Sequence, residues 1–137
     1  MKANEIMIGD WVLMDLNYSE EDPMYARPNY QPYKIQNGED IDLACETNCI
    51  GGANVYQPIS LTHDLLLANG FIFEPKIGYI SADGRINLDH RIPNYPRKWY
   101  VHIDNEDYQT IASCDLDYLH QLQHLLTICG IEKEWKL

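Results

Sequence analysis

Turn-forming residue pairs interrupt this sequence at short intervals, and they constrain its fold more than any other feature. Asn37-Gly38 and Asp83-Gly84 each separate two short runs of bulky and branched residues, and the acidic stretch 104–107 separates a third pair of runs. Asn-Gly and Asp-Gly pairs supply the positive φ angles that tight hairpins need. The pattern therefore predicts a mainly antiparallel sheet built from about three hairpins, over 33–46, 77–89 and 98–112.

The C-terminal segment predicts an amphipathic helix over residues 116–129. Asp115 is a typical helix start, and Gly130 is a typical residue just past a helix end. At 100° per residue, the apolar side chains of this segment share an arc of about 120°. We expect Ile131 and Trp135 to pack back onto the sheet. The apolar arc contains Tyr118, Leu119, Leu122, Leu125, Leu126 and Cys129.

A short central helix is expected over residues 62–69. Thr62 can cap its start, and Asn69-Gly70 can end it. Phe71 and Phe73 follow and are expected in the core. The remaining elements predicted from turn residues and composition are strands over 11–16 and 55–60 and a loop over 17–33.

The length of 137 residues suits one compact domain with a single core. Short strands that outnumber the helices, and that are joined by tight turns, favour a mixed architecture with an antiparallel sheet. We therefore predict an α+β protein that forms a single domain over residues 1–137.

The chain carries a formal net charge of −11, and only residues 76–102 hold an excess of basic side chains. Such a balance repels phosphate backbones, so no binding to duplex nucleic acid is expected. No apolar run approaches the roughly 20 residues that span a bilayer, and the N-terminus lacks a secretory signal pattern. We expect a cytoplasmic protein without membrane association. In that compartment, buried thiols rather than disulfides or zinc ligands are expected at Cys45, Cys49, Cys114 and Cys129.

His120 and His124 are one helical turn apart, which is the spacing of a metal-binding histidine pair. In zinc proteases a glutamate base follows the first histidine, whereas Gln121 stands here and cannot accept a proton. A metal site would also need a third ligand from elsewhere in the chain. Both histidines lie opposite the leucine arc, with Gln123 beside them, so they are expected to be solvated. We expect no metal and no cofactor.

Residues 90–102 interleave basic and aromatic side chains. Arg97, Trp99 and Tyr100 belong to this segment, and such a mixture can stack on bases and neutralise phosphates. The alternative is that the aromatic residues begin a core strand while the charges stay in solvent. Core packing is the favoured interpretation, because most of the remaining chain is acidic.

Three spaced blocks of sequence stand out in a fixed order. They are Ile8-Gly9-Asp10-Trp11-Val12, Pro58-Ile59-Ser60-Leu61-Thr62 running to Asn69-Gly70-Phe71, and Tyr118-Leu119-His120-Gln121-Leu122-Gln123. Together they resemble a family of small uncharacterised bacterial proteins from gut anaerobes and from their prophages and mobile elements, whose typical blocks read roughly IGNWV, PIPLT…L…GF and YVHQLQNLYF. The resemblance implies a bacterial, cytoplasmic protein and carries over His120 and Gln123, but it implies no established activity, ligand or catalytic residue.

The leading functional hypothesis is a non-catalytic accessory or protein-interaction module. It rests on abundant tyrosines and on the lack of a Gly-x-Ser-x-Gly elbow or a glycine-rich phosphate loop, so no catalytic residue is named. One alternative is an enzyme or small-ligand binder whose pocket includes His120 and Gln123. Another is a nucleic-acid-related or DNA-mimic protein, which would show its charges segregated into stripes.

Overall fold

The computed structural model describes residues 6–17, 29–41, 56–90 and 99–137. Contacts within the chain divide it into two compact units, Met1–Ile59 and Ser60–Leu137. Each unit contains one antiparallel sheet, and helices complete the architecture, so the predicted α+β class is confirmed. A division by contacts does not test whether the two units unfold together, and the single domain over 1–137 stays a prediction.

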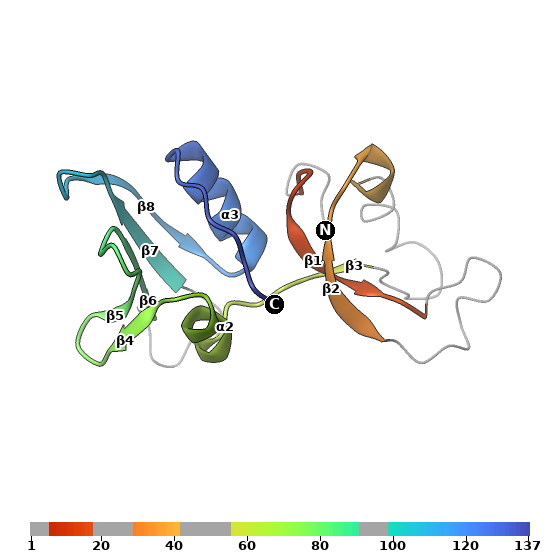
Figure 1. Ribbon diagram of the computed structural model, residues 1–137, viewed down its shortest axis with the longest axis horizontal. Coiled ribbons are helices and arrows are strands. Elements are labelled where there is room, and N and C mark those ends of the chain that lie inside the picture. The colour runs from red at the N-terminus through yellow and green to blue at the C-terminus, as the bar shows by residue number, and fades with distance from the viewer. Residues whose placement is uncertain (1–5, 18–28, 42–55, 91–98) are drawn as a thin grey trace. The chain divides into compact units, whose positions relative to one another are not determined.

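The N-terminal unit contains a three-stranded antiparallel sheet of β1 (Trp11–Asp15), β2 (Tyr30–Lys34) and β3 (Tyr56–Pro58), with β1 in the centre (Figure 1). The strands predicted over 11–16 and 55–60 are thereby confirmed. The buried core of this unit consists of Ile6, Val12, Ile35 and Tyr56.

Strand β2 corrects the prediction of a loop over 17–33, because residues 30–33 pair with β1. The proline at position 32 is tolerated because β2 is an edge strand, where a missing N–H need not break a ladder. Asp15 secures the two ends of the connection: its Oδ1 accepts the backbone N–H of Asn17 at 3.0 Å and that of Asn29 at 2.8 Å. Pairing with β1 therefore outweighs the loop-like composition.

The hairpin predicted at 37–40 is wrong, because residues 38–41 are helical. The side chain of Asn37 accepts the backbone N–H of Asp40 at 3.0 Å, as a helix N-cap does. Asp40 in turn accepts the N–H of Gln36 at 2.9 Å and the hydroxyl of Tyr33 at 3.0 Å. Asparagine serves both as a turn residue and as a helix cap, so the local signal was ambiguous. Most of the strand predicted after this turn lies outside the described residues.

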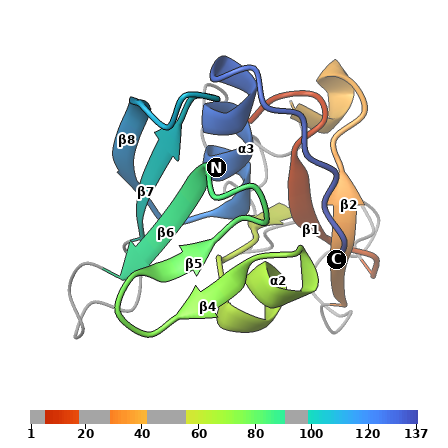
Figure 2. The same ribbon diagram turned by 60° about the vertical axis from the view of Figure 1, so that its left-hand side comes forward.

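The C-terminal unit contains a five-stranded sheet in the order β4-β5-β6-β7-β8, with every pairing antiparallel (Figure 2). The hairpins predicted around Asp83-Gly84 and around 104–107 are confirmed as β5-β6 and β7-β8. Gly84 has φ +75°, as the predicted turn requires. The strands are β4 (Ile72–Glu74), β5 (Gly78–Ile80), β6 (Ile86–His90), β7 (Trp99–Asp104) and β8 (Thr110–Leu116).

Two helices belong to this unit, and both were predicted. Helix α2 (His63–Ala68) begins at Thr62, whose side chain accepts the N–H of Leu65 at 3.2 Å. Helix α3 (Leu119–Ile128) lies beside β7 and β8 (Figures 1 and 2). The core of the unit includes the fully buried side chains of Leu88, Val101 and Ile103 on the sheet and of Leu119, Leu122 and Leu126 on α3.

Helix α3 starts later than the predicted residue 116, because β8 extends to Leu116. Asp115 is therefore a strand residue and not the helix cap. The side-chain oxygen of Gln121 instead accepts the backbone N–H groups of Asp117 at 2.7 Å and Tyr118 at 3.1 Å. A glutamine that reaches back over the first turn satisfies N–H groups that the helix itself leaves without partners.

Candidate functional site

His120 lies inside the molecule, with only 1% of its surface exposed, which corrects the prediction that it is solvated. Its ring lies parallel to that of Tyr118 at 5.8 Å between centroids, and His124 meets it edge-on at 5.9 Å. The helical phase correctly placed His120 away from the leucine arc, but phase alone does not show what else covers that side of a helix. Gln123 and His124 are half-buried.

Of the aromatic residues of 90–102 that the structure describes, Trp99 and Tyr100 do not form one base-stacking surface. Trp99 is buried with 2% exposure, whereas Tyr100 is half-buried. Successive residues of a strand point to opposite faces, so the two rings of β7 lie on different sides of the sheet. The structure thus supports core packing for Trp99. Arg97 lies outside the described residues.

A polar cluster occupies the face of the sheet opposite to Trp99. The Nε2 atom of His102 lies 2.9 Å from Asp104 Oδ1 and 2.9 Å from the hydroxyl of Thr110, which also donates to Asp104 Oδ1 at 3.2 Å. In a nucleophilic triad the carboxylate and the hydroxyl contact different ring nitrogens, which lets the ring pass a proton between them. Here both contact the same nitrogen. The cluster holds β7 and β8 together where their register shifts between Ile103 and Asp104.

The two described cysteines are free thiols. Both were predicted to be buried, but Cys114 is exposed and Cys129 is half-buried. Desolvation raises the pKa of the Cys114 thiol, and the nearby Asp115 carboxylate raises it further. A raised pKa lowers the fraction of reactive thiolate at neutral pH, so Cys114 is not an activated nucleophile. The other two cysteines, Cys45 and Cys49, lie outside the described residues.

Large apolar side chains are exposed on α2, on β4 and in the turn that follows β4. We call this set the edge patch. β4 is the first strand of the sheet, and all three of its residues are exposed. The edge patch consists of Leu67 (43% exposed), Ile72 (57%), Phe73 (44%) and Ile77 (51%).

Phe73 was predicted to be a core residue, and its exposure is a correction. Its ring is nevertheless held in place, 5.0 Å from the ring of Tyr79 and 5.7 Å from that of His63. His63 Nδ1 and the hydroxyl of Tyr79 are 2.6 Å apart. Tyr79 is buried and packs edge-on against Trp99 at 5.4 Å. A row of rings thus runs from the core to Phe73 at the surface.

An exposed aromatic ring that is fixed before binding loses little conformational entropy when a partner covers it. Such rings are typical energetic centres of protein interfaces. Burial raises the pKa of Tyr79, and the Asp64 carboxylate adds to the effect, so its hydroxyl stays protonated at neutral pH. The sequence signal for the short strand of this site is the pair Gly70 and Pro75, which bracket only four residues.

Comparison with protein-family models, curated proteins and solved structures finds no match to this chain. Among the described residues, no helix is long and apolar enough to cross a bilayer. Within the same part of the chain, no three or more histidine, cysteine, aspartate or glutamate side chains are grouped so that they could hold a metal ion.

Proposed function

We propose that this protein is a non-catalytic interaction module that binds another protein through the edge patch. The observation that carries the proposal is the exposed ring of Phe73, fixed by Tyr79 and His63 and accompanied by exposed Ile72 on the same strand. Covering a fully exposed apolar side chain of this size contributes about 1.5 to 3 kcal/mol, and these two, which are 44% and 57% exposed, can contribute about half of that. Two or three such side chains are enough to anchor a specific interface.

The enzyme or small-ligand hypothesis ranks second, because burial of His120 keeps that ring from an incoming substrate in this conformation. The geometry of His102 with Asp104 and Thr110 also differs from that of a proton relay. The nucleic-acid hypothesis ranks third, because Trp99 is in the core. From the sequence resemblance we further propose a bacterial, cytoplasmic protein linked to mobile elements.

Site-specific photo-crosslinking in cells tests the proposal. A benzophenone amino acid replaces Ile72, and in a matched variant it replaces Ile111, which is exposed to 46% on the other edge strand β8. We expect a discrete crosslinked protein from position 72 that is absent from position 111. Adding Phe73→Ser should remove that product. The same products from both positions, or none from position 72, would contradict the proposal.

A further inference from the structure

We propose that β4 accepts an extended, positively charged segment of the partner as an added strand. The inference rests on the proposed function and specifies how the partner binds. Among the described strands, β4 pairs with β5 alone, so it is an edge strand of the described sheet. An edge strand presents backbone N–H and C=O groups that another extended chain can pair with.

The two edges of the sheet differ in how well they are protected. On β8, the register shift between Ile103 and Asp104 disturbs the ladder, and Asp115 places a charge at the next-to-last residue of the strand. Bulges and charges are the usual means by which proteins prevent further strand pairing. β4 has neither in its interior, since its one charged residue, Glu74, is its last. Strand addition therefore favours β4.

β4 presents an apolar side chain on each face of the sheet, so an added strand can make side-chain contacts on both faces. Ile72 shares a face with its cross-strand partner Ile80, and Phe73 shares the opposite face with Tyr79. Because β4 has only three residues, backbone pairing alone supplies few hydrogen bonds. Contacts of the added strand with Ile72 and Phe73 must supply the remaining affinity.

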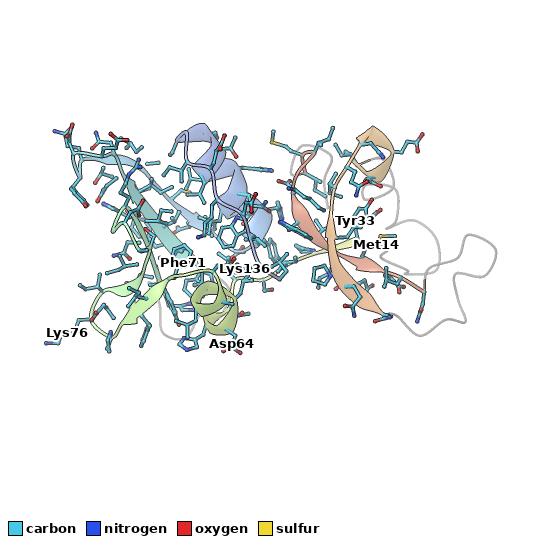
Figure 3. All side chains as sticks on the ribbon, viewed as in Figure 1. Met14, Tyr33, Asp64, Phe71, Lys76 and Lys136 are labelled. Carbon is cyan, nitrogen blue, oxygen red and sulfur yellow. The ribbon has the colours of Figure 1, made fainter. Side chains whose placement is uncertain are left out.

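The charges around β4 select a basic segment. Asp64 on α2 and Glu74 on β4 are exposed acids, while Lys76 lies at the tip of the next turn (Figure 3). The unit that contains β4, residues 60–137, holds 11 acidic and 7 basic side chains, a net charge of −4, so a second copy is repelled and a basic segment is attracted. Charges within a Debye length of about 8 Å of the added strand act on it with little screening.

Three labelled ten-residue peptides test the inference by fluorescence anisotropy at physiological salt. The first alternates valine with lysine, the second alternates valine with glutamate, and the third is the first with its two central valines replaced by proline. The proline peptide keeps the charge but cannot pair as a strand. We expect the lysine peptide to bind at least tenfold more tightly than either of the others. Equal binding of the lysine and proline peptides would mean charge attraction without strand pairing, and would overturn the inference.

Two further measurements locate the binding. Phe73→Ser should lower the affinity for the lysine peptide at least fivefold, whereas Ile111→Ser on β8 should leave this affinity unchanged. In the wild-type protein, the peptide should slow amide hydrogen exchange at residues 72–74, a readout that needs no variant. Protection elsewhere, or a dimer that forms through β4 and excludes the peptide, would overturn the inference. If photo-crosslinking at position 72 captures a partner but the lysine peptide does not bind, the proposed interaction module is supported and the proposed strand addition is contradicted.

Discussion

The side-chain amide of Asn69 binds the backbone of Lys136 with two hydrogen bonds, accepting its N–H at 2.6 Å and donating to its carbonyl at 2.9 Å. Phe71 lies close by (Figure 3), and its ring stacks on that of Trp135 at 6.3 Å. Lys133 donates to the carbonyl of Asn69 at 2.8 Å. The segment after α3 is thus fastened to the end of α2, and Trp135 is buried.

Replacing Asn69 with alanine should lower the free energy of unfolding by about 2 to 3 kcal/mol, since each lost bond at a buried site costs about 1 kcal/mol. Urea denaturation measures the loss, and a red shift of tryptophan emission reports the release of Trp135. Glu134→Ala changes an exposed residue of the same segment and should stay within about 0.5 kcal/mol of wild type. Similar losses in both variants would show that Asn69 does not hold the segment.

Leu122→Ala should lower the free energy of unfolding by about 2 to 5 kcal/mol, because Leu122 is completely buried on α3 and its loss leaves a cavity. Leu67→Ala is the matched control on α2, where the side chain is 43% exposed, and should cost less than about 1 kcal/mol. Chemical denaturation compares the two. Equal losses of unfolding free energy in the two variants would contradict the assignment of the leucine arc to the core.

Gly78→Ala should lower the free energy of unfolding by about 2 kcal/mol or more. Gly78 has φ +106°, and an added Cβ would lie 2.4 Å from the carbonyl oxygen of Leu88. Gly38→Ala offers a control in the helical turn, where an added Cβ meets nothing within 4 Å. That variant should be neutral or stabilising by up to about 1 kcal/mol. Thermal unfolding followed by circular dichroism distinguishes them, and a tolerated alanine at position 78 would refute the close approach.

Stability should fall as the pH rises from 10 to 12. Burial and the Asp40 carboxylate raise the pKa of Tyr56 from 10.0 to about 12. Over this range the folded state therefore keeps the Tyr56 proton while the unfolded chain releases it. Ionisation of Tyr56 thus lowers the free energy of unfolding progressively between pH 10 and 12 and has no effect on it below that range. Tyr56→Phe should reduce the slope of unfolding free energy against pH in urea titrations. The exposed Tyr108 provides the control, and an equal change of slope in Tyr108→Phe would argue against Tyr56 as the source.

Duplex DNA should not bind at micromolar protein and physiological salt, because the net charge of −11 repels it. Fluorescence anisotropy of a labelled duplex measures this directly. A single strand should leave the emission of the buried Trp99 unchanged, because that ring cannot stack on a base. Sub-micromolar binding that weakens steeply with salt would restore the nucleic-acid hypothesis and require a basic patch that includes Arg97.

Three sequence blocks, at 8–12, 58–71 and 118–123, coincide with turns and helix caps. Gly9 has φ +97°, and Asp10 accepts the N–H of Met7 at 2.7 Å just before β1. Thr62 caps α2, and Gln121 reaches back to the start of α3. These residues act on neighbours only a few positions away. That is why their pattern can be read from sequence, and why it predicts fold and not activity.

The local elements could be predicted from residues within single segments. The Asp83-Gly84 turn, the cap at Thr62 and the leucine arc of α3 depend on backbone preferences and periodicity within one segment, and each was found where it was expected. The turn at Asn37 shows the limit of such signals, because the same residue type can start a helix.

Which side chains are accessible could not be predicted in this way, because it depends on tertiary packing. Whether a ring is buried depends on distant segments that cover it, and periodicity within one segment carries no information about them. His120 was expected in solvent and lies inside, whereas Phe73 was expected in the core and lies at an open strand edge. The candidate site follows from this difference: sheet order makes β4 an edge strand, and packing of Tyr79 on Trp99 supports Phe73 from beneath.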